Sequence, residues 1–210
     1  MILTPIAPDD LPRILTVFAA GLAARDALAR AALRRIGAAP RAALSLAEEA
    51  AARERVASFA QGLGIATLDD EPAKAFSWDG ATIRARSEPS VLLHEIAHWL
   101  ICPPTRRPLL DFGLGAGPES GRKAEADAAR IADPATRERE EAMASLLGIL
   151  WEAEFGLPAI AAFAEQNWLE RYDQPGTPAY FATVIGWLRE AGLIDRTARP
   201  IGLTLVASPG

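Results

Sequence analysis

The chain of 210 residues is poor in several features that would each mark a class of protein. Its single cysteine, Cys102, excludes internal disulfides and any cysteine-rich metal site, and it is typical of a reducing compartment. Lysine occurs only at Lys74 and Lys123, and the formal net charge is -5, so no basic stripe of the kind that phosphate backbones require is present. We therefore expect no direct nucleic-acid partner.

The sequence also lacks long apolar runs and the residue pattern of a secretory signal. No stretch reaches the ~18 apolar residues that a membrane span needs. The opening MILTPIAPDDLP lacks both the positively charged start and the continuous apolar stretch of a secretory signal. These features predict a cytoplasmic location without a membrane partner. Half of the residues are hydrophobic and 23% are charged, which is ordinary for a globular protein.

Helix-forming residues dominate what is present. Residues 8 to 62 are rich in Ala, Leu, Arg and Glu, which predicts two or three helices with the first starting near Asp9 and Asp10. Between residues 74 and 86, two short apolar segments flank Asp79-Gly80, a dipeptide that favours a tight hairpin turn. We predict an α+β fold: a predominantly helical single domain with a small antiparallel sheet packed near the helix described next.

The most informative helix is predicted from Pro89 to Cys102. Proline is favoured in the first turn of a helix, and Pro103-Pro104 prevents continuation. The segment between them, SVLLHEIAHWLI, is apolar on nearly all sides and should be buried. The whole chain is then one metalloenzyme domain with three parts: a helical N-terminal part (1–64), a metal-binding core (73–158) and a helical C-terminal part (159–210).

The pattern HExxH makes this helix a candidate metal site. His94 and His98 lie one turn apart on one face, so two imidazole nitrogens can converge on one ion. They are the only histidines in the chain, and two placed at random would stand four residues apart in roughly one case in a hundred. A third protein ligand must then be a carboxylate. Cys102 lies ~12 Å along the helix axis from His94, too far to share the ion, and is predicted to be an ordinary buried thiol.

Spacing alone leaves the third ligand open among carboxylates in two groups: Glu125 and Asp127 in one, and Glu138, Glu140 and Glu141 in the other. Within the second group, helical periodicity puts Glu140 nearer the apolar face. Glu141, however, begins a stripe with Ser145 and Gly148 whose small residues would let a neighbouring helix approach closely.

The segment SVLLHEIAHWLICPPTRRPLLDFG, residues 90 to 113, resembles the bacterial elongation factor P hydroxylase family. In that family a histidine-containing helix that ends in His-Trp is followed by an Arg-Arg pair and then by an aspartate, an aromatic residue and a glycine. The resemblance extends to a helix that ends in a Gly-x-Pro turn, here Gly156-Leu157-Pro158, and spans roughly residues 81 to 158. After Gly113 the chain departs from the family pattern, because LGAGPESG stands where the family has further aromatic residues.

The resemblance implies a particular ligand set and reaction. Counted back from Gly156, the metal-binding glutamate of the family falls on Glu141, so the ion would be held by His94, His98 and Glu141. This set is similar to that of non-haem iron oxygenases, with Fe(II) favoured and Zn(II) as the alternative. The reaction implied is the use of dioxygen to hydroxylate a lysine-derived side chain on a protein substrate, elongation factor P.

Four further residues are candidates for function. Glu95 is the candidate catalytic residue, either handling protons near the metal of a hydroxylase or acting as general base in a zinc peptidase. Arg106 and Arg107 are candidates to hold an acidic substrate surface, although they also fit scattered surface arginines. Asp111 could orient a ligand histidine, pair with one of these arginines or cap a loop. A non-enzymatic domain with a structural metal is a further alternative.

Overall fold

The computed structural model describes residues 6–71, 77–117 and 120–202. Contacts between Cα atoms divide the chain into two compact units. Unit 1 comprises Met1–Ala43 and Ser145–Ile201, and unit 2 comprises Leu44–Ala144 and Gly202–Gly210. In the described part of the chain, no helix is long and apolar enough to cross a membrane.

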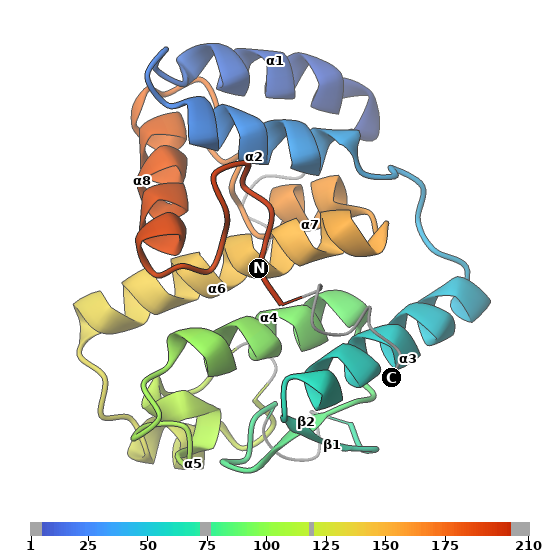
Figure 1. Ribbon diagram of the computed structural model, residues 1–210, viewed down its shortest axis with the longest axis vertical. Helices are drawn as coiled ribbons and strands as arrows, with labels where there is room; N and C mark the ends of the chain where they lie inside the picture. Colours follow the sequence, from blue (N-terminus) through green and yellow to red (C-terminus); the bar gives the residue numbers. More distant parts are fainter. Residues whose placement is uncertain (1–5, 72–76, 118–119, 203–210) are drawn as a thin grey trace. The chain divides into compact units, whose positions relative to one another are not determined.

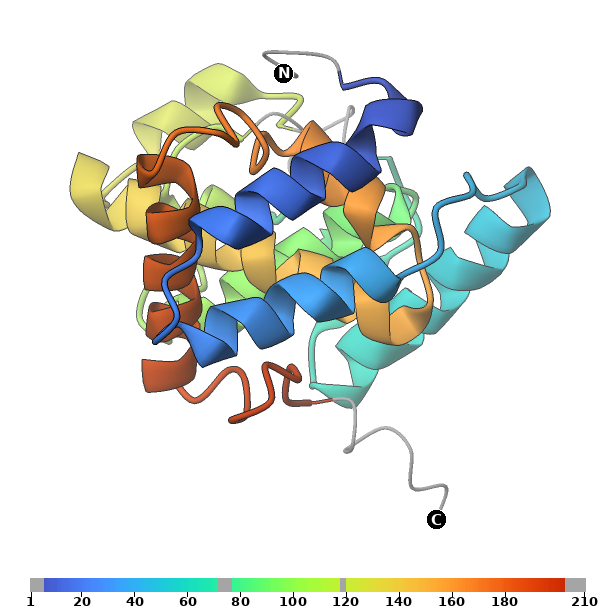
Figure 2. The ribbon, with the colours of Figure 1, turned by 90° about the horizontal axis from the view of Figure 1, so that it is seen from above.

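The described residues of unit 1 are mainly helical and contain α1 (Leu11–Gly21), α2 (Ala27–Ala38), α7 (Ala159–Glu165) and α8 (Gly176–Glu190), with one isolated antiparallel bridge between Ile194 and Pro200. The short 3-10 turn η1 (Pro8–Asp10) precedes α1, which begins close to the predicted position with a proline in its first turn. Helices α1 and α2 lie side by side, and α8 runs across both of them (Figures 1 and 2). Aromatic rings fill this unit, with Phe18, Phe163 and Phe181 fully buried in mutual edge-to-face contacts.

Unit 2 holds α3 (Leu46–Gly62), β1 (Ala66–Leu68), β2 (Thr82–Arg84), α4 (Pro89–Ile101), the 3-10 turn η3 (Leu110–Gly113) and α5 (Lys123–Ala128). The first half of α6 (Pro134–Phe155) also belongs to it, since the boundary between the units falls within that helix. Helix α3 begins with a capping box, in which Ser45 and Glu48 satisfy each other's backbone N–H groups, and it packs along α4 (Figure 1). The prediction of a predominantly helical fold is confirmed.

The prediction of an antiparallel sheet is wrong. The two strands of the sheet, β1 and β2, run parallel, with Thr67 opposite Ile83. The expected hairpin survives only as one antiparallel bridge between Trp78 and Ile83, around a turn in which Asp79 accepts hydrogen bonds from the backbone N–H groups of residues 81 and 82. Residues 74 to 76 of the predicted hairpin lie outside the described residues. The long connection from β1 to β2 gives the chain room to return in the same direction, which a tight hairpin does not.

Helices α4 and α6 have the ends that their sequences predict. Helix α4 begins at Pro89 and stops at Ile101, just before the two prolines. Helix α6 begins after Asp133, whose carboxylate accepts hydrogen bonds from the backbone N–H groups of Ala135 and Thr136. It ends before Gly156, which adopts a φ of 71° as helix-terminating glycines do.

Candidate metal site

Helix α4 directs both histidines toward one point. His98 is buried, with 4% of its surface exposed, whereas His94 is partly exposed. Their Nε2 atoms lie 2.9 Å apart, and their rings meet edge to face at a centroid distance of 4.6 Å. The i, i+4 spacing on one helical face therefore produces the convergence that the sequence predicts.

The third group at this point is Glu141 of α6. Its Oε2 atom lies 3.4 Å from His98 Nε2 and 3.5 Å from His94 Nε2. An ion with bonds of ~2.1 Å would separate two of its ligands by ~3.0 Å at a right angle and ~3.4 Å at a tetrahedral angle. The three observed separations fall close to these values. His94, His98 and Glu141, all in unit 2, could thus hold one metal ion.

The charges of the three groups depend on one another. Burial disfavours the protonated form of His98, but the carboxylate of Glu141, together with the charges of Glu95 and Glu140, outweighs burial, so that the pKa of His98 is raised. Burial likewise opposes ionisation of Glu141, yet the adjacent His98 and His94 hold its pKa far below the usual range of a glutamate. The carboxylate is therefore ionised at neutral pH and available as a ligand.

Three other carboxylates that were candidates for the third ligand, those of Glu140, Glu125 and Asp127, form hydrogen bonds with other groups. Glu140 is buried, as its periodicity predicts, but it accepts a hydrogen bond from the guanidinium of Arg106. Exposed Glu125 accepts a hydrogen bond from Arg122 Nε at 2.7 Å. Asp127 accepts one from a backbone N–H in the loop before α5. Among the described residues, only Glu141 joins the histidines.

Behind His98 lies an unusual stretch of backbone. Asp111 and Phe112 have φ angles of 41° and 55°, in the left-handed region that residues with a side chain rarely adopt. Phe112 is buried between two rings, since it stacks on Trp78 at 5.1 Å and on His98 at 5.6 Å. Strained backbone of this kind persists only where its surroundings enforce it, and it occurs often at functional sites.

Asp111 is buried beside this stack. Its Oδ2 atom accepts a hydrogen bond from the hydroxyl of Ser120, which ties the loop together. Burial raises the pKa of Asp111, while the Ser120 hydroxyl and the nearby His98 act in the opposite direction. Within the described residues, Asp111 Oδ1 and His98 Nδ1 are both buried without a hydrogen-bond partner. These two atoms are the acceptor and the donor that a carboxylate orienting a ligand histidine would use.

The remaining candidates lie close to the site but differ in what they contact. Arg106 is buried and its guanidinium contacts Glu140 and the sulfur of Cys102. Arg107 is half-buried and its guanidinium lies over the ring of Trp99 at 3.8 Å. Glu95 is half-buried on α4, and its charge contributes to raising the pKa of His98. The substrate roles of Arg106 and Arg107 and the catalytic role of Glu95 stay predictions.

Cys102 is buried, as predicted for an ordinary thiol. Burial raises the pKa of the thiol, although the guanidinium of Arg106 partly opposes this. A buried thiol with a raised pKa is a poor nucleophile and a poor metal ligand.

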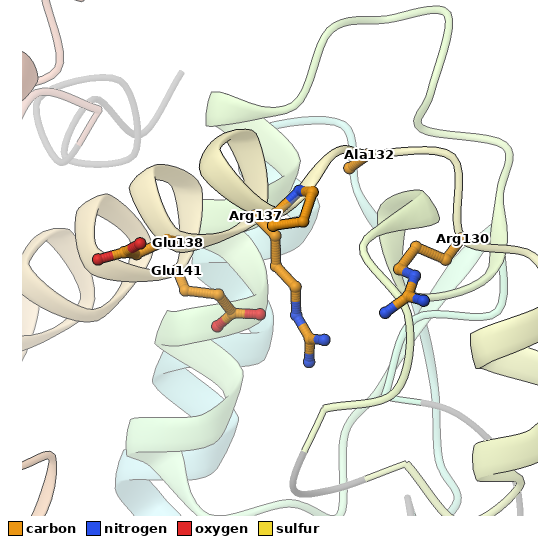
Figure 3. A pocket seen from close by; sticks show the side chains of 6 residues that line it. Arg130, Ala132, Arg137, Glu138 and Glu141 are labelled. Carbon is orange, nitrogen blue, oxygen red and sulfur yellow. The ribbon is translucent and has the colours of Figure 1, made fainter.

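Two arginines that the sequence did not single out lie next to Glu141. A pocket of about 460 Å³ opens beside the start of α6 and is lined by Arg130, Ala132, Pro134, Arg137, Glu138 and Glu141. Arg137 reaches from α6 into the space between Glu141 and Arg130 (Figure 3). The i, i+4 spacing puts Arg137 on the same face of α6 as Glu141, whereas the position of Arg130 depends on how the loop before α6 folds and on no spacing in the sequence.

Comparisons with protein-family models, with curated proteins and with solved structures find no match for this chain.

Proposed function

We propose that this protein is a metal-dependent hydroxylase that holds one divalent ion, with Fe(II) favoured, on His94, His98 and Glu141. The donor set carries the proposal. Two imidazoles and one carboxylate on one side of an ion leave its other coordination positions for dioxygen and substrate, as in the two-histidine, one-carboxylate oxygenases. The separations of the three donor atoms suit a single ion.

When bound, Fe(II) would supply the electrons with which dioxygen begins to react. Hydroxylation places one oxygen atom in a C–OH group and the other in water, and an external donor must provide two electrons and two protons. The residues of the chain would keep the ion in place and limit its contact with water. Phe112 and Trp78 form an apolar wall behind His98. Glu95, half-buried on α4, would handle protons near the ion.

The resemblance of residues 90–113 to the elongation factor P hydroxylases supports a protein substrate with a lysine-derived side chain. Arg107 is half-buried and its guanidinium stacks over the ring of Trp99, which would hold it in a fixed place from which to contact an acidic partner. We expect elongation factor P to be the first substrate to test.

The test is metal content combined with oxygen use. Protein purified without oxygen and loaded with Fe(II) should contain one equivalent of iron, and oxygen consumption should rise when the modified elongation factor P is added. His94→Ala and Glu141→Gln should each remove the bound ion. Glu125→Gln is the matched control, because it removes a carboxylate that competed for the same role but pairs with Arg122. Full iron binding by Glu141→Gln would refute the ligand set.

A zinc-dependent peptidase is the second candidate, because Glu95 lies between the two histidines, where such enzymes carry a general base. In that case one equivalent of zinc would support peptide cleavage, and Glu95→Gln would abolish cleavage while leaving the zinc bound. One equivalent of zinc without any iron-dependent oxygen use would place this function first.

A further inference from the structure

The pocket beside Glu141 is lined by two positively charged side chains, those of Arg130 and Arg137. Arg137 is half-buried one helical turn before Glu141, and Arg130 comes from the loop that precedes α6. Figure 3 shows both guanidinium groups pointing into the same space, whereas Glu138 points away from them. This space borders the third candidate metal ligand.

Among the described residues, neither arginine has a charged partner that would account for its position. Arg137 donates one hydrogen bond, to the backbone carbonyl of Ala116 at 3.0 Å. A guanidinium has five N–H donors, and a half-buried one normally meets a carboxylate. In the described part of the chain, no carboxylate forms an ion pair with Arg130 or Arg137, and the nearby carboxylate of Glu141 is directed to the histidines.

The fold holds Arg130 closely in this place. Gly115 has a φ of 89°, and a Cβ atom there would lie 3.1 Å from Cδ of Arg130 and 3.0 Å from the carboxylate of Asp127. The loop can therefore pass against the arginine only because this residue is a glycine. The first N–H groups of α6 are already bound by Asp133, so the anion-binding capacity of the pocket comes from its side chains and not from the helix end.

We propose that Arg130 and Arg137 form a carboxylate-binding subsite beside the metal centre, so that a molecule acted on at this centre carries a carboxylate group. The facing groups, two guanidinium ions and the Glu141 carboxylate, leave one net positive charge. One charge matches a carboxylate better than a phosphate dianion, which Glu141 would repel. Guanidinium groups also match the two oxygens of a carboxylate in geometry. That this subsite binds part of a substrate rests on the proposed hydroxylase function, but carboxylate binding by the two arginines does not depend on it.

The carboxylate could belong to a free organic acid or to an acidic side chain of a protein substrate. Propionate, a monoanion, represents the first source, and acetyl-glutamate amide represents the second. Propionamide is the uncharged control ligand. Each would be titrated by calorimetry into the metal-loaded and the chelator-treated protein, and metal content would be measured in parallel.

Arg130→Gln and Arg137→Gln should each weaken binding of the preferred carboxylate at least tenfold and leave metal content unchanged. Arg139→Gln is the matched control, since it removes the same charge from an exposed position of α6 outside the pocket. Tighter binding of propionate than of the capped glutamate assigns the site to a free acid, and the reverse assigns it to a protein side chain; both support the subsite.

Three results would overturn the subsite. They are propionamide binding as tightly as propionate, equal losses of affinity in Arg139→Gln and Arg137→Gln, and carboxylate binding that needs the metal but neither arginine. This experiment distinguishes failure of the carboxylate subsite from failure of the proposed hydroxylase function. Arginine-dependent binding by a protein that takes up no metal would support the subsite and reject the hydroxylase, whereas metal uptake without such binding would reject the subsite alone.

Discussion

At the scale of single residues, the site depends on how buried polar groups find partners. His98 is almost fully buried, and an imidazole that binds a metal through one nitrogen normally donates a hydrogen bond from the other. Its Nδ1 and the Oδ1 of Asp111 are both buried without a partner among the described residues. The two atoms therefore do not hydrogen-bond each other in this structure, and the role of Asp111 in positioning His98 stays a prediction.

Asp111→Asn should therefore weaken metal binding by roughly 10- to 100-fold, the usual effect of losing a carboxylate behind a ligand histidine. Asparagine keeps an acceptor for Ser120, so the loop should stay folded. Competition with a coloured chelator would measure the affinity, and a circular dichroism spectrum would check the fold. Wild-type affinity in the variant would mean that Asp111 serves only the loop.

Glu140 and Glu141 show which properties of a single residue can be predicted from the sequence and which cannot. Periodicity correctly predicts that Glu140 lies on the buried side of α6. It cannot show that the group facing Glu140 is Arg106 and not a metal ion. Adjacent residues point ~100° apart on a helix, so only one of the two can face the histidines. The resemblance selected Glu141, and the geometry of the three donor atoms agrees.

Glu140→Gln should lower the free energy of unfolding by about 3 kcal/mol, because it leaves the charge of Arg106 buried without its partner. Metal content should stay at the wild-type level, in contrast to Glu141→Gln. Urea denaturation and elemental analysis would test both parts. The double variant Arg106→Met/Glu140→Leu should recover most of the lost stability, since it removes both charges together.

At the scale of elements, prolines and caps made α4 and α6 predictable, whereas the sheet was not. Pro89 and Pro103 bound α4 by excluding a backbone donor, and Asp133 supplies acceptors where α6 begins. The strands β1 and β2 have three residues each, too few for an alternating pattern to appear. Their parallel pairing depends on contacts between segments that are distant in sequence.

The loop that carries η3 is the element that supports the site from behind. Phe112→Ala should cost about 3 to 5 kcal/mol, the usual range for a fully buried phenylalanine, and should also weaken metal binding because His98 loses a stacked neighbour. The matched variant is Phe59→Ala, which removes an equally buried ring in α3 that does not stack on His98. Both variants should be destabilised, but only the first should bind metal less tightly than expected from its folded fraction.

At the scale of the whole molecule, each unit contains a glutamate with a shifted pKa, and the two shifts have opposite directions. In unit 2, Glu141 is half-buried and has a depressed pKa beside its histidines. In unit 1, Glu152 is 3% exposed, and burial together with the charge of Glu165 raises its pKa to about 8. Its Oε1 has no hydrogen-bond partner among the described residues. Near neutral pH, Glu152 is therefore a carboxylic acid inside the folded protein.

This difference predicts how stability changes with pH. The folded protein keeps the proton on Glu152 up to about pH 8, whereas an unfolded chain releases it near the ordinary glutamate value of about 4.3. Between these values the unfolded state binds fewer protons, so the contribution of Glu152 to stability falls as pH rises, by at most about 1.4 kcal/mol per pH unit. Glu152→Gln removes this pH-dependent contribution. The free energy of unfolding of the variant should therefore equal that of wild type near pH 4 and exceed it by a growing amount up to pH 8.

Urea denaturation at pH 5, 6, 7 and 8 would measure the difference between Glu152→Gln and wild type, with Glu190→Gln as the control because Glu190 is exposed at the end of α8. Subtracting the stability of wild type from that of Glu152→Gln at each pH cancels the contributions of all other titrating groups, including those of the metal site. A constant difference across this range would show that Glu152 ionises normally in the folded protein, either because water reaches it or because the helix ends around it open. A difference that grows with pH would show that a buried acid in unit 1 limits the stability of the protein in alkaline solution.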